Sequence, residues 1–201
     1  MRIAVITAGL SEPSSTRLLA DRLEKATTEA LHERGAAVET TTIEVRTLAH
    51  DVVDLLLTRV ASPELSLART NVQDADALII VTPTFSMSYS GLFKSFIDVL
   101  EEGSLAGMPV LLAATGGTAR HSMVLDTSLR PLLSYLKALT LPTAVYASAE
   151  DWGSPGLDVR IERAGRELAD LLIALPSRHR SDPFDTTSSG FVDFESLLGE
   201  S

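Results

Sequence analysis

The chain has 201 residues, of which 45% are hydrophobic, and its 27 Asp and Glu residues outnumber its 17 Lys and Arg residues for a net charge of −10. This acidic balance argues against nucleic acid and against an anionic membrane surface as main partners, because both select basic proteins. The absence of cysteine excludes disulfides, zinc–thiolate sites, iron–sulfur clusters and a thiol nucleophile. With no apolar run of about 18 residues and no signal peptide, a cytoplasmic globular protein is expected.

The N-terminal half alternates between short β-branched runs and longer segments with helical spacing. The run at 2–8 ends at Gly9 and predicts a strand buried on both faces. Leucines and alanines recur at helical spacing over 16–34, and Gly35 ends this long helix. A threonine-rich strand is expected at 38–45, followed by helices at 52–60 and 65–75.

The C-terminal half continues the same alternation. The segment 77–82 (ALIIVT) is the most apolar strand candidate, and Pro83 is expected to end it. An amphipathic helix is expected over 91–102, and its apolar circumference suits either deep core or an interface between subunits. The remaining expected elements are a strand at 108–114, a helix at 122–138 that Pro131 should kink, a strand at 140–147 and a helix at 157–175.

Strands that alternate with helices predict an α/β fold, in which a five-stranded parallel sheet carries helices on both faces. One domain at 1–175 accommodates these elements, and from Pro176 the composition shifts to Ser, Asp, Thr and Gly. For the tail at 176–201, docking on a subunit and disorder both stay open. In such an open sheet ligands bind beyond the carboxyl ends of the strands, so chemistry is expected in the loops after the first, third and fourth strands.

The loop after the first strand is rich in hydroxyls and leads into a helix. Exposed N–H groups at a helix start attract a phosphate group, and Ser and Thr hydroxyls add neutral donors. An N-cap accounts for one hydroxyl only, so an anion site is the favoured interpretation. The loop lacks the Lys and the second Gly of a P-loop and lacks G-x-G-x-x-G, which argues against nucleoside-triphosphate hydrolysis and a tightly held dinucleotide. The four hydroxyls belong to Ser11, Ser14, Ser15 and Thr16.

The other two loops offer backbone groups and a few side chains. Pro83 stiffens the start of the second loop, where Phe85 either packs on a planar ligand or plugs the core. In the third loop, the paired glycines Gly116 and Gly117 permit close approach of the backbone to a ligand. Both loops are therefore candidate walls of a ligand site.

Two basic residues follow the paired glycines. Arg120 is favoured as a contact to an anionic substrate in an otherwise acidic protein. His121 is either a hydrogen-bonded structural residue or an acid–base group, since imidazole titrates near neutral pH. No cluster of His, Asp and Glu has metal-ligand spacing, so we expect no metal.

Residues 82–98 (TPTFSMSYSGLFKSFID) resemble the strand-end signature of the NAD(P)H-dependent FMN reductases, with its TP start, serine-rich turn and SGxxK helix opening. The first loop is similar to the phosphate loop of that family, although many relatives carry a basic residue where this chain has Glu12. Residues 114–123 (ATGGTARHSM) resemble the branch that supplies luciferase-like flavin monooxygenases. The resemblance covers 1–175 and implies a flavodoxin-like three-layer sandwich with strand order 2-1-3-4-5.

The resemblance also implies a cofactor, a hydride donor and the residues that hold them. The cofactor is FMN and the donor is NADPH or NADH, with Arg120 and His121 as substrate contacts. No catalytic acid or base of the protein is expected, because the flavin carries the hydride chemistry. The implied FMN contacts are Ser11, Ser14, Ser15, Thr16 and Arg17 at the phosphate, Pro83, Thr84, Phe85 and Ser86 at the isoalloxazine, and Thr115, Gly116, Gly117 and Thr118 at its pyrimidine end.

The function implied is that of an FMN reductase that supplies reduced FMN to a luciferase-like flavin monooxygenase. A quinone or azo-dye reductase on the same fold and a non-enzymatic flavodoxin-type electron carrier remain as alternatives. A phosphate-switched receiver domain is disfavoured, because Gly9 and Thr82-Pro83 stand where its acidic residues would be. Relatives form dimers or tetramers, so a homodimer or homotetramer is expected.

Overall fold

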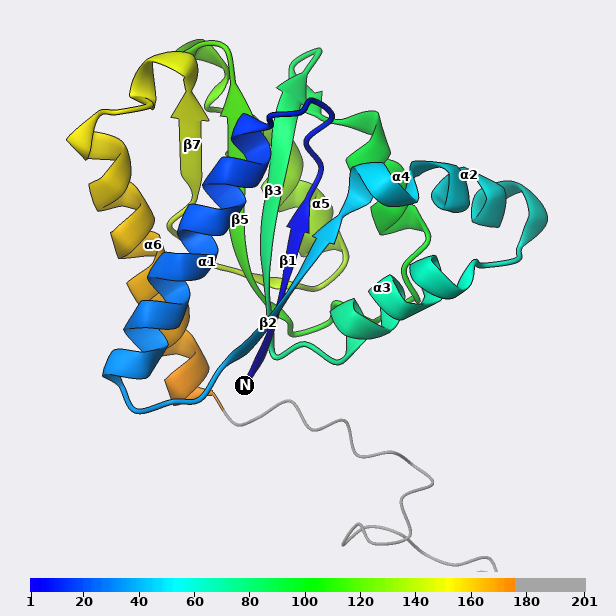
Figure 1. Ribbon diagram of the computed structural model, residues 1–201, viewed down its shortest axis with the longest axis horizontal. Helices are drawn as coiled ribbons and strands as arrows, with labels where there is room; N and C mark the ends of the chain where they lie inside the picture. The colour runs from blue at the N-terminus through cyan, green and yellow to red at the C-terminus, as the bar shows by residue number, and fades with distance from the viewer. Residues whose placement is uncertain (176–201) are drawn as a thin grey trace, which may run out of the picture.

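Seven strands form one sheet between two layers of helices in the computed structural model, which describes residues 1–175 (Figure 1). They are β1 (Arg2–Thr7), β2 (Glu39–Glu44), β3 (Ala77–Phe85), β4 (Ser88–Tyr89), β5 (Pro109–Gly116), β6 (Leu139–Thr140) and β7 (Val145–Ser148). Their order is β2-β1-β3-β5, with β6 and β7 parallel to β5 and with β4 antiparallel to β3. The α/β class and the flavodoxin-like order are confirmed, since β6 and β7 together take the place of the fifth strand.

Helices cover both faces of this sheet. The central strand β3 shows why both layers are needed, because Leu78 and Ile80 pack into the core on one face, whereas Ile79 and Val81 pack into the core on the other. An unbroken apolar run is typical of a strand that is buried on both faces. The helices are α1 (Ser15–Glu33) and α6 (Pro155–Ala174) on one face, and α2 (Ala49–Thr58), α3 (Pro63–Gln73), α4 (Gly91–Asp98) and α5 (Arg130–Tyr135) on the other.

Pro83 does not end the third strand, contrary to the sequence prediction. β3 continues to Phe85, because Pro83 pairs with Thr115 of β5 and the two residues after it pair with β4. Ser86 and Met87 form the turn between β3 and β4, and both have left-handed backbone angles, with φ of 48° and 66°. Two successive positive φ angles are what a type I′ hairpin turn requires. The hairpin thus extends the strand past the proline.

Two predicted helices differ from the structure. The helix predicted over 91–102 ends at Asp98, because the next two amides bond carbonyls only three residues back, as in a 3₁₀ turn. The helix predicted over 122–138 is divided, and Pro131 lies in the first turn of its last part, where a missing N–H costs no hydrogen bond. The parts are the π-helix η3 (Leu125–Leu129) and α5, and the 3₁₀ helix η2 (Ala119–His121) precedes the predicted range.

The predicted fifth strand, 140–147, is split into β6 and β7, which is one reason why the sheet has more than five strands. Pro142 lies between the two parts and has no N–H to donate, although Leu141 still donates to the Val110 carbonyl at 3.0 Å. The 3₁₀ helices η1 (Val45–Leu48) and η4 (Ala149–Asp151) follow β2 and β7. The tail at 176–201, with its predicted docking or disorder, lies outside the described residues.

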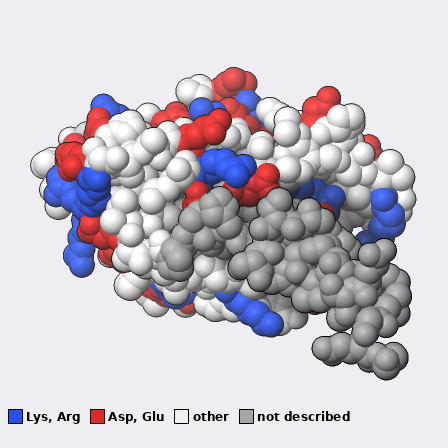
Figure 2. Space-filling model, turned by 90° about the horizontal axis from the view of Figure 1, so that it is seen from below, with Lys and Arg blue, Asp and Glu red and all other residues white. Residues whose placement is uncertain are grey.

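Charges of both signs are interspersed on the face of the molecule shown in Figure 2. Surface ion pairs include Arg34 with Asp170 at 2.6 Å and Arg2 with Asp74 at 3.5 Å. Exposed pairs of this kind contribute little to stability, so the fold depends on the two apolar layers. Within residues 1–175, no helix is long and apolar enough to cross a membrane.

Candidate functional site

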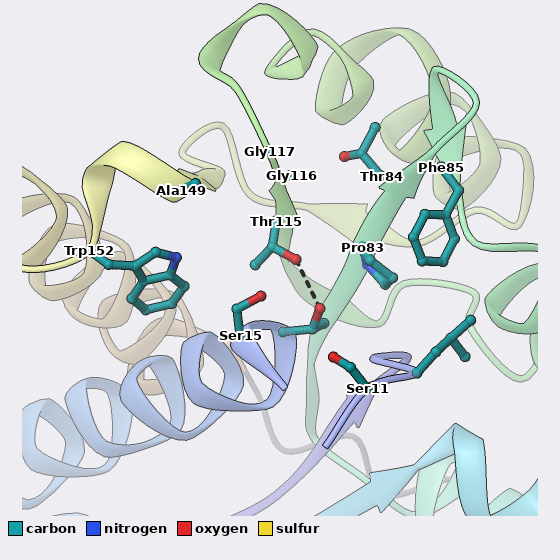
Figure 3. A pocket seen from close by; sticks show the side chains of 12 residues that line it. Ser11, Ser15, Pro83, Thr84, Phe85, Thr115, Gly116, Gly117, Ala149 and Trp152 are labelled. Atoms are coloured by element: carbon teal, nitrogen blue, oxygen red, sulfur yellow. Dashed lines mark hydrogen bonds between the residues drawn. The ribbon is translucent and has the colours of Figure 1, made fainter. Parts of the chain in front are cut away.

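A cavity of about 560 Å³ opens at the carboxyl edge of the sheet, where the loops after β1, β3 and β5 meet (Figure 3). Ligands of open α/β sheets bind at this edge. Its lining consists of Leu10, Ser11, Ser15, Thr16, Pro83, Thr84, Phe85, Thr115, Gly116, Gly117, Ala149 and Trp152. None of these side chains is ionisable, so the cavity offers hydroxyls, backbone groups and apolar surface rather than an acid or a base.

The first wall of the cavity is the start of α1 with the loop before it. Ser14 is the N-cap of α1, and its hydroxyl accepts the Arg17 N–H at 3.2 Å. A Cβ on Gly9 would lie 2.0 Å from Ser14 Oγ and 3.1 Å from Thr16 Cβ, so a larger residue there would displace the capping hydroxyl. Ser11 and Ser15 line the cavity beside the first helical turn, whose N–H groups have no partner within the helix. The Ser14 hydroxyl therefore caps the helix as an acceptor, and its role as an FMN contact stays a prediction.

A buried hydrogen bond ties this wall to the centre of the sheet. The hydroxyls of Thr16 and Thr115 lie 2.8 Å apart, with 2% and 3% of their residue surfaces exposed (Figure 3). Each hydroxyl satisfies the other, as buried polar groups require. The contact fixes the first turn of α1 against the end of β5, although 99 residues separate the two threonines.

The second wall is the end of β3. Pro83, Thr84 and Phe85 line the cavity, and Phe85 is 46% exposed, which excludes the interpretation of Phe85 as a core plug. Ser86, another predicted contact, lies in the exposed hairpin turn and is not part of the lining. The hairpin thus presents three of its four predicted residues to the cavity.

The third wall is the turn that follows β5. Gly116 and Gly117 line the cavity, whereas Thr118 lies just beyond it as the N-cap of η2, with its hydroxyl accepting the Arg120 N–H at 3.1 Å. Arg120 and His121 belong to η2 and are not part of the lining either. Both follow Gly117 within four residues of the sequence.

Arg17, predicted as a phosphate contact, is directed elsewhere. Its Nε donates to Asp21 Oδ1 at 2.6 Å, and its Nη1 bonds to Glu44. The hydrogen bond to Asp21 raises the pKa of the Arg17 guanidinium above its ordinary value, against the opposing effect of burial. Arg17 therefore joins α1 to β2 and does not line the cavity.

A family model described as NADPH-dependent FMN reductase matches residues 1–153, which include all three walls. The chain belongs to this family. The predicted resemblance to the FMN reductases is therefore confirmed, and the match over residues 1–153 extends beyond the three motifs that first indicated it.

Individual relatives support the same assignment. The chain is 35% identical over 175 residues to "FMN reductase (NADPH)" of Pseudomonas aeruginosa, covering 85% of this chain and 91% of that protein. It is 35% identical over 176 residues to "NADH-dependent FMN reductase SfnE" of Pseudomonas putida, covering 85% and 92%. The crystal structure of an oxidoreductase from Corynebacterium diphtheriae is similar with a TM-score of 0.84 and 46% identity, covering 87% of this chain and 98% of that one.

A fourth wall of this family member's cavity is formed by Ala149 and Trp152, neither of which is among the predicted FMN contacts, although the loop of Trp152 could from the sequence face either the site or a partner. η4 holds it in place, since the Asp151 carboxylate accepts the Ser148 N–H at 2.8 Å and the Arg160 guanidinium at 2.6 Å. Although burial opposes the change, hydrogen bonds from Ser148 and Arg160 lower the pKa of the Asp151 carboxyl below its ordinary value. The loop after β7 leaves the same sheet edge as the other loops, and that rule was the signal that would have found it.

Proposed function

We propose that the protein transfers a hydride from NADPH or NADH to FMN, which binds in the cavity at the carboxyl edge of the sheet. The observation that carries this proposal is the lining itself, which combines hydroxyls at a helix start with flat apolar walls and no ionisable side chain. Such a lining binds and orients a redox group but has no acid or base of its own. FMN, when bound, supplies the hydride acceptor.

The residues of the cavity fit FMN in size and in chemistry. A volume of about 560 Å³ suits a ligand of this class. Ser11, Ser15 and the first N–H groups of α1 would hold the phosphate, because a helix start attracts an anion. Phe85 would flank the flat ring system, and Gly117, with open space around the position of a Cβ, would let it approach the backbone. Protein groups here would bind and orient the cofactor.

The acidity of the protein does not oppose this anionic ligand locally. No carboxylate lines the cavity, and two carboxylates in and near the first loop are paired with arginines. Glu12 accepts from Arg46 at 3.1 Å, and Glu44 bonds to Arg17. Because these arginines are paired with carboxylates, the phosphate would be bound by hydroxyls and backbone N–H groups. This fits a loop that has Glu12 where many relatives have a basic residue.

The hydride donor would approach from the side of η2. Relatives are named for NADPH and for NADH, and the two nucleotides differ by a 2′-phosphate. Arg120 is exposed and forms no ion pair with the residues that the structure describes, in contrast to Arg17 and Arg46. We therefore assign Arg120 to the 2′-phosphate of NADPH and His121, beside it, to a contact with the same nucleotide.

For Arg120→Ala we expect kcat/KM with NADPH to fall about tenfold while kcat/KM with NADH changes little, because only NADPH loses a charged contact. Steady-state rates with both nucleotides provide the measurement. Arg163→Ala is the matched control, since Arg163 is an exposed arginine of α6. Equal effects on both nucleotides would remove Arg120 from nucleotide selection.

Reduced FMN would leave the open cavity and reach a flavin monooxygenase of the luciferase-like type. The resemblance of residues 114–123 to that branch supports this partner. Assembly into a homodimer or homotetramer is supported by apolar side chains beside the cavity mouth, since Phe85 is 46% and Met87 is 66% exposed. Light scattering tests the assembly, and a monomer at micromolar concentration overturns it.

A steady-state assay tests the central function. The purified protein should oxidise NADPH or NADH only when FMN is present, and the rate should saturate with FMN. Turnover of quinones or azo dyes much faster than turnover of FMN would instead support a quinone or azo-dye reductase. Tight FMN binding without oxidation of either nucleotide would support an electron carrier.

A further inference from the structure

We propose that Tyr146 is a positioning residue that holds the turn at 116–118 against the end of β3 and thereby sets the affinity of the cavity for FMN. The inference rests on the proposed function, because it concerns the FMN site. Tyr146 lies in β7, paired with Ala114 of β5, and is 8% exposed. It is not among the residues that line the cavity, so it acts through its neighbours.

The hydroxyl of Tyr146 contacts the turn in two ways. It donates a hydrogen bond of 3.0 Å to the carbonyl of Thr118. It also lies directly against Gly116, where a Cβ would come within 2.1 Å of Tyr146 Oη and 3.2 Å of its Cζ. The Tyr146 hydroxyl therefore leaves no room for a side chain at residue 116. The turn packs directly against the phenol ring and its hydroxyl.

The same part of Tyr146 lies close to the second wall. A Cβ on Gly116 would lie 3.5 Å from Thr84 Cβ, so Thr84 and the phenol approach the glycine together. The Thr84 hydroxyl is buried, has no hydrogen bond of ordinary geometry with the described residues, and points toward the strand of Gly116 in Figure 3. Tyr146 thus stands where the end of β3 and the turn after β5 meet.

The phenol keeps its proton under ordinary conditions. Burial raises the pKa of Tyr146 above its ordinary value, and the negative charge of Asp151 acts in the same direction, whereas the Thr84 hydroxyl opposes both. The raised pKa favours the protonated hydroxyl, which donates to the Thr118 carbonyl.

A turn with two glycines has many backbone conformations unless something restricts it. Ordering such a turn on ligand binding lowers affinity, whereas a turn that is already ordered avoids this cost. Gly116 and Gly117 line the cavity, whereas the Tyr146 hydroxyl, which is outside the lining, restricts the turn through its bond to Thr118. The backbone groups at the cavity are thus held in place before FMN binds.

Tyr146→Phe tests this role, because it keeps the ring and removes the hydroxyl. We expect the Kd for FMN to rise about fivefold, as the loss of one hydrogen bond implies. The midpoint potential of bound FMN should become more negative, since donors that are less well placed stabilise negative charge less. Quenching of Trp152, the one tryptophan of the chain, reports the Kd directly. Tyr135→Phe is the matched control, because Tyr135 is 84% exposed on α5.

A second pair of variants makes the test independent of stability. Gly116→Ala should raise the Kd at least about tenfold, because its Cβ cannot coexist with Tyr146 Oη. In Gly116→Ala with Tyr146→Phe the closest remaining contact is Cζ at 3.2 Å, which a small shift relieves. We therefore expect the double variant to bind FMN more tightly than Gly116→Ala alone.

The outcomes separate this inference from the proposed function. A parent protein that binds no FMN contradicts the function itself. FMN binding by the parent, with an unchanged Kd and potential in a folded Tyr146→Phe protein, overturns the positioning role even if the melting temperature falls. A double variant as weak as Gly116→Ala also overturns it, because the turn then does not rest on the tyrosine hydroxyl.

Discussion

Ser15→Ala should weaken FMN binding about tenfold and leave the melting temperature unchanged. Ser15 is exposed in the first turn of α1 and lines the cavity, and its hydroxyl forms no hydrogen bond with the described residues. Its loss therefore removes a contact to the phosphate and nothing from the fold. Hydrogen bonds to charged groups contribute about 1.5–3 kcal/mol, and 1.4 kcal/mol corresponds to tenfold in Kd. Quenching of Trp152 in an FMN titration gives the measurement.

Thr16→Val, in contrast to Ser15→Ala, should lower the stability of the fold. Thr16 and Thr115 satisfy each other at 2.8 Å in a buried position, so valine leaves the Thr115 hydroxyl without a partner. The expected loss is about 1–3 kcal/mol of unfolding free energy. Thr16→Val combined with Thr115→Val should recover part of it, because no orphaned hydroxyl remains.

Ser66→Ala, an exposed position in α3, is the control for the loss of a helix serine away from the cavity. Equal FMN affinity in Ser15→Ala and Ser66→Ala would place the phosphate away from the start of α1. A large loss of stability in Ser15→Ala would show that its hydroxyl has a structural partner.

The parts of the fold that followed from the sequence are those in which local pattern and tertiary packing agree. The long helix was found because its apolar residues recur at helical spacing, and the buried residues of α1 lie on that face, among them Leu19 and Leu23. The apolar run of β3 was found because both faces are covered. The end of β3 was missed, because Pro83 is a stop signal only when no hairpin provides pairing beyond it.

The site was predicted as three loops, and what remained hidden are contacts between distant segments. The bond between Thr16 and Thr115 joins residues far apart in the chain, and no local pattern indicates it. Arg17 illustrates the opposite case, because its partner is local. Asp21 lies four residues later on the same helix face, and it pairs with the guanidinium that was predicted to contact the phosphate. To place Trp152 at the cavity, the end of β7 has to be known, and the division of the predicted fifth strand into β6 and β7 obscured that end.

Gly165→Ala should destabilise the protein through close packing of two helices. Gly165 is buried in α6, and a Cβ there would lie 2.9 Å from the backbone carbon of Ala26 and 2.9 Å from the backbone nitrogen of Thr27 in α1. Backbone atoms in a helix cannot turn aside as a flexible side chain can, so α1 and α6 have to separate. Overpacking of this kind costs about 1–3 kcal/mol, or roughly 2–12 °C in melting temperature for a chain of this size.

Intrinsic helix propensity favours alanine at both glycines of α6, so Gly156→Ala is an informative comparison for Gly165→Ala. Alanine is favoured over glycine inside a helix by about 1 kcal/mol. At Gly156, in the first turn of α6, a Cβ would meet only Ser154 Oγ at 3.5 Å and Arg160 Nη1 at 3.7 Å. Gly156→Ala should therefore be neutral or slightly stabilising. Thermal unfolding of both variants, with a fall only for Gly165→Ala, separates close packing from propensity.

Gly165→Ala should also affect FMN binding in the cavity, because α1 and α6 both begin at its walls. Ser15 lies at the start of α1, and Trp152 lies just before the start of α6. If Gly165 sets the distance between these helices, Gly165→Ala should raise the Kd for FMN as well as lower the melting temperature, although the substituted residue lies outside the cavity. A destabilised variant with unchanged FMN affinity would show instead that the loops hold the walls in place without the helix pair.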